Sequence, residues 1–380
     1  RSPSHFFAKA SILISMKKPF FLLMILLLFS CSESRPGKKE EFRIGIPSSH
    51  MSIFKGKELS PAADFNMIVL KPEERARNLE VLIFSTRSSA FDCVVVPAPT
   101  APILEKWADP FPMSWGEGIR SEILSQFVRN GSLYALPVTL DFPVILYRED
   151  VFREEGAGVP GNLGELRGIL RKLSKKRPAG IVSTLPEEIL FLSLLACDEN
   201  AAPARFYDRS SVGLLDFFYE FDLRPLSAQD ASLFFEKEEA VAAFVQLSEA
   251  GRLIAEMKNK RIFLKAGPLP STEKAYSIFN GLCLMGYGLE KKEMKALRSF
   301  VGEPFQPDLI RAGCVPVLDK DYQIGPLGEA VASTTVIPLP FGWEECEVLK
   351  EAIRDVLVNG LAPEGSLRRA EGRRKNMKGQ

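Results

Sequence analysis

The sequence predicts an α/β fold whose residues are divided between two lobes. Residues 91–96 form a near-continuous apolar run that Pro97 closes, which is typical of a parallel strand buried on both faces. An extended segment at 65–70 and a helix-forming segment at 72–85 precede this run, so strand, helix and strand follow at the spacing of a βαβ unit. Residues 31–380 are numerous enough to build two separate hydrophobic cores.

Residues 1–30 have the features of upstream sequence followed by a secretory signal. Met16-Lys17-Lys18 is a short basic start, and the stretch from Pro19 to Ser30 carries no charge and is mostly Leu, Ile, Met and Phe. A membrane-spanning helix needs about 20 apolar residues, so this shorter stretch is not predicted to span a bilayer. Residues 1–15 precede the plausible start Met and are interpreted as carried over from an over-extended reading frame.

The segment Leu28-Phe29-Ser30-Cys31 resembles the lipobox of bacterial lipoproteins, in which the Cys is lipidated and becomes the mature N-terminus. The polar residues that follow predict that 31–41 is a lipidated tether. We therefore expect a protein of the cell envelope that is lipid-anchored to a membrane and faces the periplasm or the extracellular side.

Composition argues against several classes of function. Residues 31–380 keep 45 Lys and Arg and all 48 Asp and Glu, a formal charge of −3 that does not suit nucleic-acid binding. Only His50 remains among the histidines, no C-x-x-C pair occurs, and no Gly-rich phosphate loop is present. We predict no enzyme activity, no catalytic residues, no cofactor and no metal site. Cys93 and Cys283 lie in apolar runs and are predicted to be buried thiols.

Hydrophobic periodicity predicts the remaining elements in chain order. Residues 42–46 alternate and end at Pro47 as a short strand. A stripe of apolar residues within 348–357 predicts a helix, and Pro363 suits the first turn of a terminal helix. The others are a helix at 160–176, a mostly helical region at 186–257, strand character at 276–287 and a charged helix at 290–300.

Six segments, in order, resemble motifs of the extracellular solute-binding proteins that serve carbohydrate ABC importers, the family 1, maltose-binding-protein-like group. These are Gly131–Pro137 for G-x-x-Y-x-x-P, Ile145–Phe152 for l-Y-N-K-D-L-F, Glu155–Leu166, Gly267–Pro270, Gly313–Leu318 and Pro363–Leu367. The sequence departs from the family's pattern at several positions: Arg148 and Glu149 replace Asn and Lys, Glu238 stands where the family has Gly, and Leu282 stands where a Trp commonly follows the G-G stretch.

The resemblance implies a two-lobed, type II periplasmic-binding-protein fold in which each lobe is a mixed sheet flanked by helices and a hinge joins the lobes. The expected lobes are 42–139 with 270–313, and 140–269 with 314–375. The chain would cross between them near 137–142, 265–272 and 312–318, and the lobes would close on a ligand by hinge motion.

The resemblance also suggests ligand contacts. Asp141, in the first crossing, would be a solvated acceptor for a ligand hydroxyl, or would instead cap a turn. Phe142 would line the cleft or belong to the core. Asn280 and Gly281 resemble the family's G-G stretch and predict an amide contact, and Trp343 would stack on a sugar ring or pack.

Two further groups are candidates on weaker grounds. Ser48, Ser49 and His50 follow the carboxyl end of the first strand, where open α/β sheets bind ligands, although they also suit a polar loop. Trp115 lies before the first crossing and suits either the rim of a cleft or the core.

The predicted function is that of an extracytoplasmic receptor that binds a small polar ligand, a sugar, and delivers it to the permease subunits of an ABC importer. Its expected partners are the ligand, the permease and the membrane through the N-terminal lipid, with no nucleic acid, and the receptor would act as a monomer. The alternative is a diverged lipoprotein of the same fold that serves as an adhesion or sensor-partner module without transport.

Overall fold

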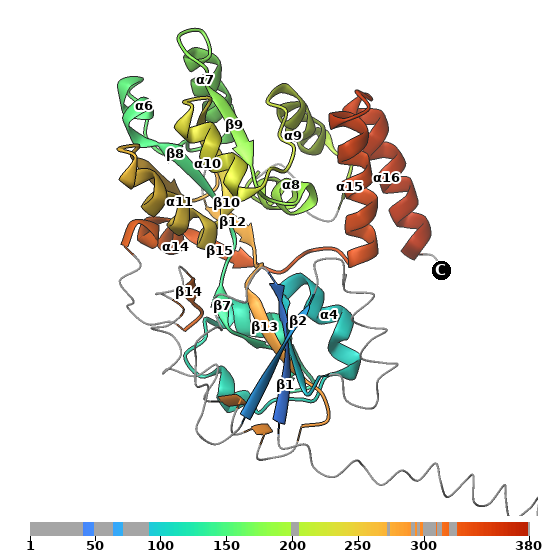
Figure 1. Cartoon of the computed structure of the whole chain (residues 1–380). Coiled ribbons are helices and arrows are strands. Elements are labelled where there is room, and N and C mark those ends of the chain that lie inside the picture. Colours follow the sequence, from blue (N-terminus) through green and yellow to red (C-terminus); the bar gives the residue numbers. More distant parts are fainter. Residues whose placement is uncertain are drawn as a thin grey trace, which may run out of the picture. The chain divides into compact units, whose positions relative to one another are not determined.

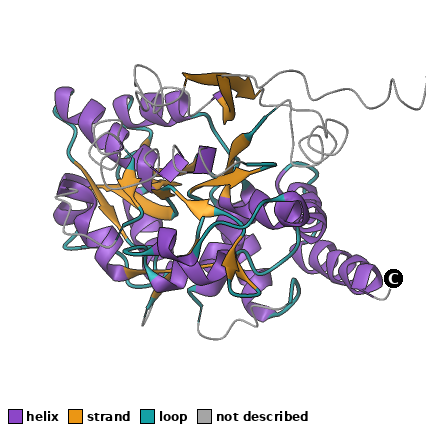
Figure 2. Cartoon of the chain, turned by 90° about the horizontal axis from the view of Figure 1, so that it is seen from below, coloured by secondary structure: helices purple, strands orange, loops and turns teal. Residues whose placement is uncertain are grey.

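The computed structural model describes residues 41–48, 64–70, 91–198, 205–271, 274–289, 293–294, 297–298, 309, 314–318 and 325–378. Residues 43–380 make one compact unit. Strands occupy the interior of the described part, and helices lie outside them (Figure 2). The predicted helices at 72–85 and 290–300 lie outside the described residues or are covered only in fragments.

The first sheet contains five strands in the order β2-β1-β3-β13-β6. β1 runs parallel to β3, whereas β13 is antiparallel to both β3 and β6, so the sheet is mixed. The strands predicted at 42–46, 65–70 and 91–96 are confirmed. The five strands are β1 (Glu41–Pro47), β2 (Asp64–Leu70), β3 (Cys93–Pro97), β6 (Leu136–Pro137) and β13 (Leu282–Gly286).

Short elements connect β3 to β6. Helical turns follow β3 directly because Pro99 and Pro102 favour the backbone angles of a first helical turn. These elements are η3 (Ala98–Thr100), α4 (Ala101–Leu104), η4 (Glu105–Trp107), η5 (Met113–Gly116), α5 (Ser121–Leu124), η6 (Ser125–Phe127), and the paired strands β4 (Val128–Arg129) and β5 (Ser132–Leu133).

The second sheet contains four strands in the order β11-β8-β10-β9. β8 is antiparallel to β10 and β11, and β9 is parallel to β10. Every residue of β8 is buried, which explains its apolar sequence from Pro143 to Leu146. The strands are β8 (Pro143–Arg148), β9 (Gly180–Ser183), β10 (Ala240–Gln246) and β11 (Leu264–Gly267).

The prediction that 186–257 is mostly helical is wrong for β10, which lies in the middle of the second sheet. Its sequence, AVAAFVQ, does not alternate because both faces are buried, so periodicity alone does not distinguish it from a buried helix. The flanking helices are present as α8 (Glu187–Ala196), α9 (Arg209–Glu220), α10 (Ala228–Glu236) and α11 (Leu247–Asn259).

Of the remaining helices, the two at the C-terminal end of the chain pack on α8 and α9 (Figure 1). Asn162 caps α7 by accepting a hydrogen bond of 2.8 Å from the Glu165 N–H. The C-terminal stripe and the helix that begins at Pro363 are confirmed. The remaining helices are α6 (Glu149–Glu154), α7 (Leu163–Leu173), η8 (Gly325–Leu327), α14 (Gly328–Ser333), α15 (Trp343–Leu357) and α16 (Pro363–Lys378).

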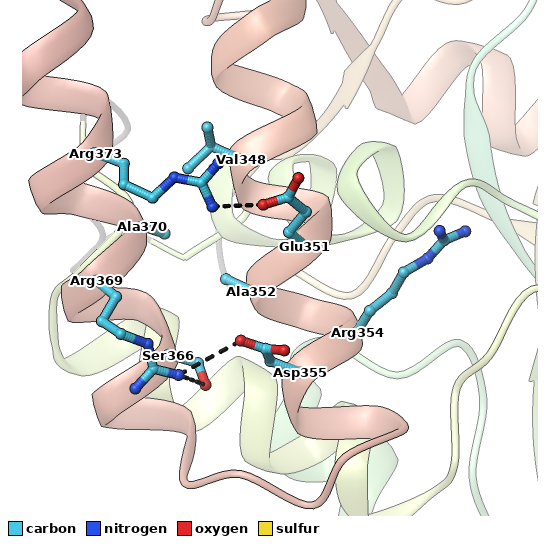
Figure 3. A pocket seen from close by; sticks show the side chains of 9 residues that line it. All are labelled: Val348, Glu351, Ala352, Arg354, Asp355, Ser366, Arg369, Ala370 and Arg373. Atoms are coloured by element: carbon cyan, nitrogen blue, oxygen red, sulfur yellow. Dashed lines mark hydrogen bonds and ion pairs between the residues drawn. The ribbon is translucent and has the colours of Figure 1, made fainter.

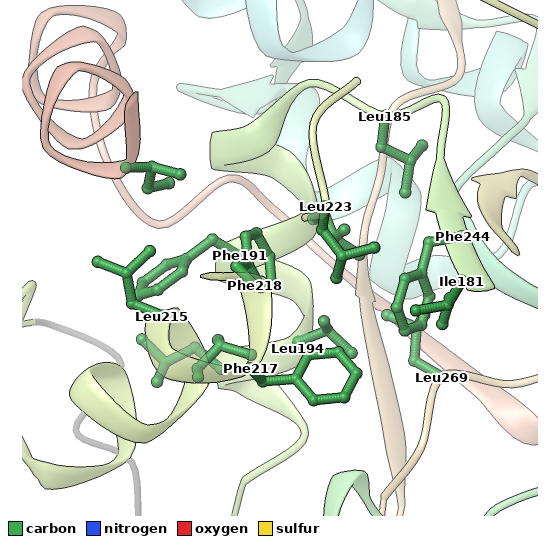
Figure 4. Packing of buried hydrophobic residues seen from close by; sticks show 14 of the residues in the cluster. Ile181, Leu185, Phe191, Leu194, Leu215, Phe217, Phe218, Leu223, Phe244 and Leu269 are labelled. Atoms are coloured by element: carbon green, nitrogen blue, oxygen red, sulfur yellow. The ribbon is translucent and has the colours of Figure 1, made fainter. Parts of the chain in front are cut away.

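One apolar core lies under these helices. Phe191 and Phe218 pack edge to face at 5.9 Å between ring centroids, and Phe244 of β10 joins them from the sheet (Figure 4). Cys93 and Cys283 are fully buried, as predicted, and each described cysteine is a free thiol. Among the helices that the structure describes, none has both the length and the apolar character needed to cross a bilayer.

Short strands join the two sheets. β7 (Thr139–Leu140) pairs with β14 (Val315–Pro316), and β12 (Ala275–Ile278) runs parallel to β15 (Thr334–Ile337). The strand character predicted at 276–287 is therefore split, and β13 continues from β12 into the first sheet (Figure 1). Leu269 and Ile278 both belong to the core under the second sheet. The chain thus passes from the β12-β15 pair into the first sheet at 279–281.

Candidate functional site

Two crossing segments lie against each other between the sheets. The Val138 N–H donates to the Leu282 carbonyl at 2.7 Å, and the Leu282 N–H donates to Thr139 Oγ1 at 2.9 Å. One step further, the Asn280 N–H donates to the Asp141 carbonyl at 2.9 Å. The segments 138–141 and 280–282 are therefore joined through their backbones.

Gly281 permits this close approach. A Cβ atom at this position would lie 2.0 Å from the Thr139 carbonyl oxygen and 2.7 Å from the Phe279 ring. Any side chain would push the two crossing segments apart. The Gly281 carbonyl also accepts a hydrogen bond of 2.8 Å from the Ala98 N–H at the end of β3.

The Asp141 carboxylate is buried, with 9% of the residue exposed, and both of its oxygens are hydrogen-bonded. One oxygen accepts from the Ser248 N–H and from the Phe142 N–H, each at 3.1 Å, and the other accepts from Ser248 Oγ at 2.6 Å. Burial raises the pKa of Asp141 to about 6, although the bonds from Ser248 and Phe142 oppose this rise.

The expectation that Asp141 is a solvated cleft-wall carboxylate is therefore wrong. Ser248 lies in the first turn of α11, whose N–H groups lack partners within the helix, and Asp141 supplies one from outside it. Sequence reasoning could not find this cap because its two partners are far apart in the chain. A direct ligand contact by Asp141 stays a prediction.

Polar side chains gather where β9 and β10 end. Thr184, directly after β9, donates a hydrogen bond to Glu249 in the first turn of α11. Gln246, the last residue of β10, has a buried side-chain amide whose oxygen and nitrogen both lack a hydrogen-bond partner among the described residues. An amide that can both donate and accept suits a polar ligand. The sequence signal for these residues is their position at the carboxyl ends of strands.

Two further carboxylates lie in the first turn of α8. Glu187 is buried and accepts from Arg354 Nε of α15 at 3.2 Å. Glu188 is only 4% exposed, and its Oε2 lacks a partner within the described part of the chain. Burial raises the pKa of Glu188, and Lys350 of α15 opposes that rise. Sequence reasoning missed both residues because acidic side chains in a first helical turn are ordinary.

The structure places the residues predicted from sequence in different settings. Asp141, Asn280 and Gly281 come together at the crossing, whereas Phe142 is fully buried and belongs to the core. Trp343 is the first residue of α15, but its side chain lies outside what the structure describes.

The remaining candidates lie away from the crossing hydrogen bonds or outside the described residues. Ser48 is exposed just after β1, and Ser49 and His50 are not among the described residues. Trp115 is half-buried and stacks on Phe111, with 5.3 Å between ring centroids and 18° between the planes. Phe111 is itself buried and bridges to Leu133, so Trp115 takes part in packing around the first sheet.

A hollow of about 380 Å³ lies between α15 and α16, and charged side chains line it (Figure 3). Arg369 pairs with Asp355 at 3.4 Å, and Arg373 pairs with Glu351. These pairs form successive rungs between the two helices, so the arginines serve to hold α16 on α15. Within the described residues, no group of three or more His, Cys, Asp or Glu gathers in a way that could hold a metal ion.

Comparison with solved structures identifies the fold. The maltose-bound MalE3 of T. maritima superimposes with a TM-score of 0.73 at 16% identity, covering 89% of this chain and 99% of that one. An ABC transporter solute-binding protein from Thermotoga lettingae bound with α-D-tagatose gives 0.71 at 14%, covering 88% and 98%. The maltotriose-bound MalE domain of Bdellovibrio bacteriovorus gives 0.70 at 13%, covering 90% and 100%.

No protein-family model matches the sequence, and no curated protein matches it either. At these identities the structural likeness establishes the fold. The chain has the two-lobed, type II periplasmic-binding-protein fold, with a mixed α/β sheet in each lobe, as predicted.

Proposed function

We propose that this chain is an extracytoplasmic solute-binding receptor of an ABC importer, which binds a sugar or a similar polyol between its lobes and delivers it to the membrane permease. The observation that carries the proposal is the likeness, over nearly nine tenths of the chain, to proteins solved with maltose, tagatose, ribitol or maltotriose bound. The proposal assigns the protein no catalytic step.

Buried polar groups at the end of β10 and at the start of α8 fit a hydroxyl-rich ligand. A sugar offers hydroxyls that both donate and accept, and the unpaired amide of Gln246 and the unpaired oxygen of Glu188 can meet such groups. Each of these buried atoms costs free energy while it lacks a partner, so a ligand that pairs with it gains affinity. We add them to Asn280 and Trp343 as proposed ligand contacts, with Ser48 at the carboxyl end of β1.

We place the hinge at the crossing segments 138–142, 279–282 and 314–318, and we assign β12 to the second lobe together with β15. The hydrogen bonds between these segments hold them side by side. Movement of one lobe against the other would then be absorbed where the segments leave this joint.

The proposal places the receptor outside the cytoplasmic membrane, anchored through a lipid on Cys31. Replacement by Cys31→Ser should convert a membrane-fractionating protein into a soluble or unprocessed one, as followed by fractionation and by mass spectrometry of the mature N-terminus. Cys314→Ser is the matched control, because it removes a half-buried free thiol and leaves the signal intact. A wild-type N-terminus that lies elsewhere and carries no acyl chain contradicts the anchor.

A thermal-shift screen tests the function directly. A ligand that binds only the folded state raises the melting temperature, so sugars, polyols, polyamines and amino acids should be compared at millimolar concentration. We expect a sugar or polyol to raise it. The affinity for that ligand, measured by calorimetry, should fall about tenfold or more in Gln246→Ala and Trp343→Ala, and should be unchanged in Gln126→Ala, an exposed amide on η6. A screen without any stabilising compound would favour a diverged module without transport.

A further inference from the structure

Asp141 connects two parts of the molecule that do not otherwise follow each other in the chain. Through its backbone carbonyl it accepts from Asn280 in the neighbouring crossing segment, at 2.9 Å. Through its carboxylate it accepts from the N–H and the hydroxyl of Ser248, in the first turn of α11. The next carbonyl, that of Phe142, accepts from the Leu247 N–H at 3.0 Å. The start of α11 is thus attached directly to the crossing.

The first turn of α11 in turn positions polar groups at the edge of the second sheet. Glu249 accepts the hydrogen bond from Thr184, and Gln246 precedes the helix with its unpaired amide. A change in the path of the crossing strand at Asp141 must therefore move α11, or else break the bonds to Ser248. In the second case the Ser248 N–H would be left without a partner in a buried setting.

We propose that the Asp141–Ser248 pair is the joint that transmits hinge movement from the crossing to α11, so that Asp141 acts on ligand binding as a positioning residue, through the helix. This inference rests on the proposed receptor function. In this inference Asp141 does not contact a ligand hydroxyl and instead holds α11 in place. The hydrogen bonds to both carboxylate oxygens support this role.

The surroundings of the joint make it sensitive to pH. Among the described residues, the charged or titratable groups that face the carboxylate are Glu249 of α11 and Cys314 beside β14, and neither supplies a positive charge. The pKa of Asp141 is raised to about 6, chiefly by burial. If closure of the lobes removes more water from the crossing, it favours the neutral form of the Asp141 carboxyl group further. Ligand binding near pH 6 should therefore be accompanied by proton uptake.

The chain offers a matched control on α9. Asp208 caps that helix through Ser211 with the same chemistry, accepting from the Ser211 N–H at 2.7 Å and from its hydroxyl at 2.8 Å. Asp208 is the N-cap residue next to α9 in the chain, so its bond joins no two distant segments. Asp208→Asn therefore reports what the loss of the charge does at an Asp–Ser cap that is local in the chain.

Calorimetry with the sugar or polyol from the screen, in two buffers of different ionisation enthalpy at pH 6, tests the joint. Wild type and Asp208→Asn should take up protons on binding, and their affinity should rise by up to about tenfold between pH 7.5 and pH 5.5. Asp141→Asn should show neither effect. An Asp141→Asn protein that keeps the wild-type proton uptake and pH profile overturns the proposal, as does one whose affinity falls equally at every pH, which would indicate a direct ligand contact.

A ligand-free measurement separates failure of the joint from failure of the receptor function. Amide hydrogen exchange should speed up at least several-fold in the first turn of α11 and in 279–282 together in Asp141→Asn and in Ser248→Ala. Asp208→Asn should accelerate exchange in the first turn of α9 alone. If exchange at 279–282 is unchanged when α11 loosens, the two segments are not coupled and the inference is wrong, whatever ligand the protein binds.

Discussion

The Arg374 guanidinium binds both carboxylate oxygens of Glu371 one helical turn earlier, with Nε at 3.0 Å from one and Nη2 at 2.8 Å from the other. The pair is buried on the inner side of α16, and the guanidinium lies over the rings of Phe206 and Phe341 at 5.4 and 5.6 Å. Glu371 also accepts from the Phe206 N–H at 2.9 Å. Arg374 is thus an internal part of the packing, although its basic neighbours on α16 are exposed.

Removal of this arginine should be costly. In Arg374→Ala, Glu371 and Glu345 would lose the buried guanidinium between them and keep only the exposed Lys375 and Lys378 as cations. The free energy of unfolding should then fall by up to about 3–5 kcal/mol. Arg373 lies on the same helix as Arg374 and makes an exposed pair with Glu351 of α15. Arg373→Ala breaks only that pair and should cost no more than about 1 kcal/mol. Urea denaturation of both variants checks the contrast, and equal losses would show that burial of Arg374 contributes nothing.

Gly281→Ala should be among the most destabilising glycine replacements in the described chain. The added methyl would lie 2.0 Å from the Thr139 carbonyl oxygen, so the crossing segments must separate, at a cost of about 2–3 kcal/mol. Gly213→Ala is the matched control because it lies exposed inside α9 with nothing within 4 Å, and it should stabilise the protein by about 0.5–1 kcal/mol. Melting temperatures that shift in the same direction would contradict the close approach.

Glu238 occupies a left-handed backbone conformation, with φ of 58°, at the position where the similar family has Gly. Glu238→Gly should stabilise the fold by up to about 1 kcal/mol, because it relieves the crowding of Cβ. Glu238→Ala keeps the crowding and loses only the exposed ion pair with Arg148 at 3.4 Å, so it should be neutral or slightly destabilising. If chemical denaturation shows that Glu238→Ala is more stable than Glu238→Gly, the backbone at this position is not strained.

The raised pKa of Asp141 predicts how stability depends on pH. The folded state holds the proton up to about pH 6, and the unfolded state releases it near 3.8. The stabilisation from this group is therefore complete below pH 3.8 and is lost as the pH rises through 6, and it amounts to at most about 3 kcal/mol. The difference in unfolding free energy between wild type and Asp141→Asn should shrink by that order between pH 4 and pH 7. If this difference in unfolding free energy stays constant with pH, the Asp141 carboxylate is solvated and its pKa is not raised.

The sequence was sufficient to predict the fold class, the first three strands and the two C-terminal helices, because each carries its own local signal. The near-continuous apolar run ending at Pro97 and the apolar stripe in 348–357 are examples, and both are confirmed. β10 was missed because a strand buried on both faces, rich in Ala, has no alternation to separate it from a helix. The split at 279–281 lies between two strands of similar character and has no turn signature apart from Asn280-Gly281.

The candidate site was only partly predictable because its contacts join residues far apart in the chain. The proximity of Asn280 to Asp141 agrees with the resemblance, but the bonds from Ser248 to Asp141 depend on how α11 packs after β10, which itself was not predicted. The unpaired atoms of Gln246 and Glu188 become visible only when burial is known. Local sequence reports periodicity and caps, whereas burial of a polar group is a property of the assembled fold.

The order of strands in the two sheets also sets the order in which the chain can fold. The strands of the second sheet, β8 to β11, all lie between Pro143 and Gly267, so that sheet can assemble from one continuous stretch. β3 of the first sheet, in contrast, has its partner β13 only at Leu282–Gly286. Long-range pairing of this kind is slow, and a strand edge that waits for its partner is prone to aggregate. We therefore expect refolding to show the second sheet protected first, while the edge of β3 remains the segment most dependent on chaperones until residue 286 has been made.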